Sequence, residues 1–120
     1  INGCSGDPVD VTITIQPEPV ISPTLDRTVC SDAIVNLTLA TNGTSVNALD
    51  YNIVNRIVAP GLVPVAQQVV PANNVAANYL QNEIYRNTTN AALAVQYEVQ
   101  ATGTIGNCLG DTRIVVVTIN

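Results

Sequence analysis

The sequence predicts an all-β fold, and three observations support that prediction. Val and Thr are frequent among the 120 residues, and such β-branched side chains pack well on pleated sheets. Hydrophobic residues make up 47% of the chain, but four Tyr are the only aromatic ones, so aliphatic side chains must fill the core. Apolar and polar residues alternate along several short segments, as expected for half-buried strands. The length is that of one domain.

The first expected strand, at 9–15, is repeated near the other end of the chain. A shift of 104 residues places NGCSGDPVDVTITI (2–15) on GNCLGDTRIVVVTI (106–119). Identical pairs include Cys4 and Cys108, Gly6 and Gly110, Asp7 and Asp111, Val11 and Val115, Thr14 and Thr118, and Ile15 and Ile119. In both copies a Cys-x-Gly-Asp turn, in which Gly is free to take a positive φ, precedes an alternating strand. The chain is therefore expected to span slightly more than one period of a tandem array.

A proline-rich segment, QPEPVISP at 16–23, follows the first strand. Three Pro in eight residues favour a stiff, extended connection and cannot lie in a central strand. We therefore expect residues 1–16 to form the closing strand of a preceding repeat, or an extra strand docked on this one. Residues 17–23 are expected to form a Pro-rich linker, and residues 24–120 the repeat itself.

Within 24–120, turn signals rich in Gly, Pro and Asn separate short alternating segments. Strands are predicted at 28–30, 34–40, 51–58, 65–70, 92–101 and 113–119. In the strand at 92–101, Val95, Tyr97 and Val99 are expected to face inward.

One short helical segment is predicted near 74–86. Val75, Tyr79, Leu80 and Ile84 recur there at helical spacing. About seven short strands separated by turns predict an immunoglobulin-like β-sandwich around this segment.

The charges and residue types exclude several classes of function. The net charge is −5, the four cations are all scattered Arg, and the chain has no His or Lys. Phosphate binding needs grouped cations, so a nucleic-acid partner is not expected. No apolar run reaches the roughly 20 residues of a membrane-spanning helix, so membrane insertion is not expected. Without His no Ser-His-Asp or Cys-His site can be built, and we expect no enzyme activity.

Several segments carry a resemblance to a known family: QPEPVISP, TVCSDAIVNLTLATNGT, VPANNVAANYLQNEIYRNTTNAALAVQYEV, GNCLGD and VVVTIN. Together they resemble PKD-like repeat domains, which occur in tandem in very large cell-surface proteins of Bacteroidota, including gliding-motility adhesins. The resemblance implies an immunoglobulin-like (PKD-like) β-sandwich, an extracellular location at the cell surface, and adjacent repeats as partners. It also implies a role as spacer or filament segment. One departure is Asp32, where the family's motif usually carries Gly.

The three cysteines do not match a metal site, because neither a Cys-x-x-Cys motif nor any His is present. An odd count in an exported protein favours one internal bridge and one thiol with a partner elsewhere, whereas three free thiols are expected in the cytosol. The resemblance implies a stabilising disulfide between Cys30 and Cys108. It leaves Cys4, the equivalent of Cys108, as an inter-repeat cysteine whose partner is a Cys30-equivalent in the preceding repeat.

Calcium is the one cofactor that the residue types suggest. Carboxylate oxygens suit Ca²⁺, and Asp7, Asp10 and Asp111 are the candidate ligands. No EF-hand spacing is present, and Asp at a turn normally bonds its own backbone. No other metal or cofactor is expected.

Two alternatives to a spacer role remain open. One is a module that binds a surface polysaccharide or a protein, for which a sugar-stacking platform would need exposed aromatic residues. Tyr79 and Tyr97 are expected in the core, which leaves only Tyr51 and Tyr85 for such a platform. The other is a filament in which each chain donates its first strand to a neighbour.

Overall fold

The computed structural model describes residues 3–120 and shows seven strands and no helix in that range. The strands are β1 (Arg27–Val29), β2 (Ala48–Val58), β3 (Leu62–Ala66), β4 (Ala72–Val75), β5 (Ile84–Asn87), β6 (Leu93–Gly103) and β7 (Arg113–Ile119). No helix that could span a membrane is found among the described residues. The predicted all-β class is confirmed.

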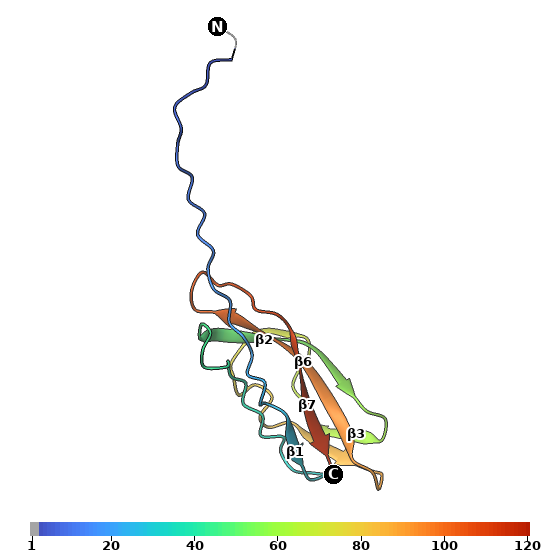
Figure 1. Ribbon diagram of the computed structural model, residues 1–120. Coiled ribbons are helices and arrows are strands. Elements are labelled where there is room, and N and C mark those ends of the chain that lie inside the picture. The colour runs from blue at the N-terminus through green and yellow to red at the C-terminus, as the bar shows by residue number, and fades with distance from the viewer. Residues whose placement is uncertain (1–2) are drawn as a thin grey trace.

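Five strands form one mixed sheet in the order β1-β7-β6-β2-β4 (Figure 1). β1 is parallel to β7, and the other neighbours are antiparallel. β3 and β5 form a separate antiparallel pair. β7 lies inside the larger sheet, between β1 and β6, so both of its edges are hydrogen bonded.

The core forms along the inner faces of β6 and β7, where the sequence alternates. The buried residues are Val95, Tyr97 and Val99 of β6 and Val115, Val117 and Ile119 of β7. The inward orientation predicted for the β6 residues is confirmed. They join one cluster with side chains from β2, β5 and the segment 35–39. Each buried aliphatic side chain contributes roughly 1.5–3 kcal/mol, and three buried tyrosines, Tyr51, Tyr85 and Tyr97, add to the same cluster.

Residues 34–40, predicted as a strand, do not form a regular one, and the positive φ of 52° at Asn36 interrupts the extended backbone. An isolated bridge joins Ile34 to Ile84, and no continuous ladder follows. The chain opposite is a run of turns at 77–82, which cannot supply evenly spaced partners. The predicted alternation nevertheless holds, because every second residue is buried. These are Val35, Leu37 and Leu39.

The predicted helical segment near 74–86 is wrong. The chain passes from β4 through the turns at 77–82 into β5. The turns contain hydrogen bonds between residues three apart, such as Tyr79 N to the Ala76 carbonyl at 3.1 Å, so apolar residues recur there at near-helical spacing. Carbonyls of this stretch accept bonds from the segment 35–39 instead of from a following helical turn. Tertiary pairing therefore overrides the local pattern.

β3 begins earlier than the strand predicted at 65–70, and it includes Pro64, a residue type that normally interrupts strands. Pro is tolerated because β3 pairs on one side only, so a missing N–H on its open edge leaves no partner unsatisfied. After Ala66 the backbone leaves the sheet. The backbone N–H of Gln68 then donates to the Glu83 carboxylate at 2.8 Å.

Among residues 3–120, four non-glycine residues have positive φ, and all are Asn or Asp: Asp32, Asn36, Asn74 and Asn107. These side chains tolerate the left-handed region better than most others. Asp32, the residue at which the chain departs from the resemblance described above, has φ 66°. The backbone at this position is therefore one that glycine favours and that Asp can adopt.

Candidate functional site

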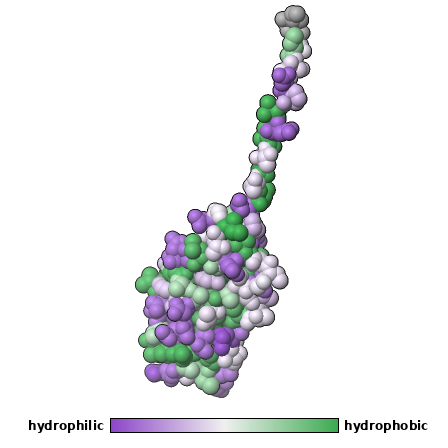
Figure 2. Space-filling model, turned by 90° about the vertical axis from the view of Figure 1, so that its left-hand side faces the viewer, coloured by the Kyte–Doolittle hydropathy of each residue, from purple (hydrophilic) through white to green (hydrophobic). Residues whose placement is uncertain are grey.

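Residues 3–15 form an extended arm that leads away from the folded body, residues 19–120 (Figure 1). The arm belongs to no sheet, and it stretches the longest dimension of the molecule to 83 Å. Hydrophobic residues recur along it in full view of solvent (Figure 2). Four of them are 78–84% exposed: Val9, Val11, Ile13 and Ile15.

The exposed residues of the arm match the buried residues of β7. Val11, Ile13 and Ile15 correspond to Val115, Val117 and Ile119, whose exposed fractions are at most 1%. Similar strand sequences are thus found twice, once as a buried central strand and once without any sheet around it. An apolar strand face of this kind is normally covered.

The linker meets the folded body at Pro19, which is buried between two glycines. A Cβ at Gly110 would overlap the Pro19 carbonyl oxygen, and a Cβ at Gly103 would lie 3.2 Å from Pro19 Cδ. Gly103 N donates to the Cys108 carbonyl at 2.8 Å, and Gly110 N donates to the Ala101 carbonyl at 2.9 Å, so a small hairpin holds both glycines in place. Gly110 is therefore required for the close approach of the linker.

The glycine of the repeated Cys-x-Gly-Asp motif does not have the positive φ that its turn position predicted. Neither Gly6 nor Gly110 lies in the left-handed region. The positive φ falls three residues earlier in each copy, at Gly3 (80°) and at its equivalent Asn107 (51°). The two copies thus share a backbone feature as well as a sequence.

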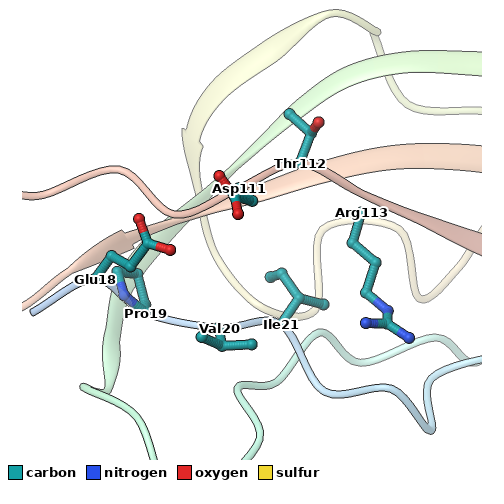
Figure 3. Close-up of a pocket in the computed structure, with 7 residues that line it drawn as sticks. All are labelled: Glu18, Pro19, Val20, Ile21, Asp111, Thr112 and Arg113. Atoms are coloured by element: carbon teal, nitrogen blue, oxygen red, sulfur yellow. The ribbon is translucent and has the colours of Figure 1, made fainter.

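A groove of about 280 Å³ lies beside this junction, between the linker and the start of β7 (Figure 3). Its charged residues are Glu18, Asp111 and Arg113. Figure 3 shows Arg113 at the opposite end of the groove from Glu18. In the described part of the chain no three acidic, Cys or His side chains gather as metal ligands. Asp7 and Asp10 lie exposed on the arm, so the structure does not bring the three calcium candidates together.

All three cysteines are free thiols, and the structure does not bring Cys30 and Cys108 together. Cys30 lies beside the last residue of the chain: Asn120 N donates to the Val29 carbonyl, and Ser31 N donates to the Asn120 carbonyl. Cys108 precedes β7, at the opposite end of that strand. The seven residues of β7 span about 20 Å, whereas a disulfide needs Cα atoms within about 7 Å. The bridge implied by the resemblance is therefore not formed within this chain.

A buried polar cluster, which the sequence did not indicate, lies in the core around Glu83. The Tyr85 and Tyr97 hydroxyls donate to Glu83 Oε1 at 2.7 and 2.6 Å. Arg56 Nη1 and the backbone N–H of Gln68 donate to Glu83 Oε2, each at 2.8 Å. The carboxylate is fully buried and both of its oxygens are bonded, so the cluster fixes the packing and offers no open site.

Burial also removes the tyrosines as candidates for a sugar-binding platform. Tyr51 and Tyr85, which the sequence left as candidates for a sugar platform, are 6% and 0% exposed. Tyr79 is half-buried, and its hydroxyl donates to the Val69 carbonyl at 2.9 Å. Burial raises the pKa of Tyr85 to about 12 and raises the pKa of Tyr97 further above its usual range, with the Glu83 charge acting in the same direction. An aromatic stacking surface is therefore not formed by these tyrosines.

Glu83 could have been recognised from its spacing to Tyr85. Glu83 directly precedes β5, and residues two apart share one face of an extended segment, whereas the helical prediction placed the two residues on different faces.

Comparison of the chain with protein-family models, with curated proteins and with solved structures found no match.

Proposed function

We propose that this chain is one link of a tandem array of immunoglobulin-like, PKD-like repeats that serves as a spacer in a large extracellular surface protein. The observation that carries this proposal is the arm. It repeats β7 in sequence, and it exposes the three residues that β7 buries. The arm is the closing strand of a preceding repeat, and the linker after it leads into the next one.

The close packing at Pro19 supports a spacer role. Pro19 of the linker packs directly against Gly103 and Gly110 of the folded body, so the linker is fixed at this point. The Pro residues of the linker stiffen the remaining segment. An array with such junctions stays extended, because each linker packs against the repeat that follows it.

Strand exchange between separate chains is supported less well. The position that a donated copy of the arm would occupy, between β1 and β6, is already filled by the chain's own β7. A donated strand would have to displace β7 or add to one of the outer strands, β1 and β4. The closing strand of a covalently attached preceding repeat meets no such competition.

A polysaccharide-binding or protein-binding role is the other candidate. The buried tyrosines remove the aromatic platform on which the sugar-binding version depended. The groove in Figure 3 is lined by the linker and by the residues that lead into β7, which suits a junction between repeats better than a ligand site.

The proposal can be tested with a two-copy chain in which a second copy of residues 17–104 is fused directly to the N-terminal side of residue 1. In the two-copy chain, residues 1–16 follow the added copy just as residues 105–120 follow residue 104 in the original chain. The arm should therefore form the closing strand of the added sheet. Amide hydrogen exchange at Val11, Ile13 and Ile15 should slow by orders of magnitude relative to the 120-residue chain.

A substitution provides the matched control. Ile13→Asp should unfold the added copy of the two-copy chain, because it places a charge in a core. The same substitution should leave the melting of the 120-residue chain unchanged, since Ile13 is 78% exposed there. Unchanged exchange of the arm in the two-copy chain would exclude the array.

A further inference from the structure

We propose that Cys30 of each repeat forms a disulfide with Cys108 of the repeat that follows it. This inference rests on the proposed tandem array, and it assigns the cysteines a partner different from the one implied by the resemblance. It would give each junction a second covalent connection beside the linker peptide.

The first step of the argument places Cys30 at the end of its own repeat. The two residues that flank it, Val29 and Ser31, both hydrogen bond Asn120, at 3.0 and 2.9 Å. Neighbouring strands lie about 5 Å apart, so the Cys30 backbone is about that far from Asn120. Cys30 is exposed at this position.

The second step places Cys108 at the start of its repeat. The residue of the arm that corresponds to Asn120 is Gln16. A Cβ at Gly106 would lie 3.1 Å from Gln16 Cγ and 3.5 Å from Cys108 Sγ, so Gln16 and the Cys108 sulfur pack against the same glycine.

The two placements meet at one residue. In an array Gln16 is both the residue that ends the closing strand of the preceding repeat and a neighbour of Cys108 in the present one. The Cys30 of the preceding repeat flanks that same residue. The exposed Cys30 thiol and the half-buried Cys108 thiol of successive repeats are thus brought beside the same residue of one junction. A disulfide needs Cα atoms within about 7 Å, so we expect the two segments to draw together as the bond forms.

The remaining cysteine follows the same rule. Cys4 corresponds to Cys108 and belongs to the preceding repeat. Its partner is therefore the Cys30 equivalent of the repeat that comes before that one. Within one repeat no pair is available, because Cys30 and Cys108 lie at opposite ends of β7.

Bond formation requires an oxidant, and a small-molecule disulfide such as oxidised glutathione suffices. The Cys30 thiolate attacks the glutathione disulfide, and one glutathione leaves as a thiol. The Cys108 thiolate of the next repeat then displaces the second glutathione, which completes the protein S–S bond. The two electrons and two protons lost by the cysteines are carried by the two reduced glutathione molecules.

The test uses the same two-copy chain, oxidised with glutathione disulfide and mapped by non-reducing proteolysis and mass spectrometry. Of its four cysteines two should become linked, Cys30 of the added copy and Cys108 of the original chain. Cys4 and Cys30 of the original chain should remain as free thiols.

Two matched variants separate this pairing from others. Cys30→Ser in the added copy should abolish the bridge, whereas Cys30→Ser in the original chain should leave it intact. A bridge between Cys30 of the added copy and Cys4, or between Cys30 and Cys108 of the original chain, would overturn the inference.

Hydrogen exchange distinguishes failure of the disulfide from failure of the array. If Ile13 is protected but all four thiols stay free, the array stands and the inter-repeat bond is excluded. If Ile13 exchanges as fast as in the 120-residue chain, the array is excluded and the inference falls with it.

Discussion

The carbonyl oxygen of Pro19 occupies the space in which a side chain at Gly110 would begin. This contact joins the linker to the folded body, and it gives the repeated Cys-x-Gly-Asp motif a physical reason. Gly6 occupies the same place in the arm, where nothing lies within 4 Å of it. The same residue is thus sterically required in one copy and free in the other.

Gly110→Ala should lower the free energy of unfolding by about 1–3 kcal/mol, because the added methyl group must displace the Pro19 backbone. Urea unfolding monitored by circular dichroism measures the change. Gly6→Ala is the matched control and should leave the unfolding curve unchanged. Equal effects of the two substitutions would contradict the proposed contact.

Glu83→Gln should lower the free energy of unfolding by about 3–5 kcal/mol, because it leaves the largely buried Arg56 guanidinium without its counter-charge. Asp32→Asn serves as the comparison, since it removes the exposed ion pair with Arg86 and keeps a side chain that tolerates positive φ. That change should stay within about 1 kcal/mol. The cluster would lose its structural importance if both variants unfolded at the same urea concentration.

Stability should decline at alkaline pH because of the buried phenols. In the unfolded chain Tyr ionises near its usual pKa of 10.0, whereas burial raises the pKa of Tyr85 to about 12 in the folded state and raises that of Tyr97 as well. The stabilisation is therefore complete below pH 10 and is lost as the pH rises through about 12. Urea unfolding across this range should show the decline, and Tyr85→Phe should make it shallower. A flat profile would contradict the burial of these hydroxyls.

Asp32→Gly should preserve or slightly raise stability, since glycine adopts the φ of 66° without steric cost and the ion pair that is lost is exposed. Asp32→Val should lower the free energy of unfolding by about 1–2 kcal/mol, because a β-branched residue is disfavoured in the left-handed region. Thermal melting of the two variants beside the parent chain gives the comparison. A more stable Val variant would show that the positive φ is not maintained.

Much of the sheet could be predicted because its strands bury one face in alternation. The strand predicted at 113–119 is confirmed at both ends, and the inward positions of the strand at 92–101 are correct. The segment at 74–86 could not be predicted, since turns and a helix produce similar local spacing. Only the hydrogen bonds from residues 35–39 distinguish the two.

The sequence by itself determined the all-β class and the duplication of the β7 strand, because both follow from local patterns of residue type. Only the tertiary structure decided which groups meet. It separated Cys30 from Cys108 by the length of β7, buried Glu83 among Tyr85 and Tyr97, and set Pro19 against Gly110. These relationships join residues far apart in the chain, and their distances depend on how strands pair and pack, which no local pattern specifies.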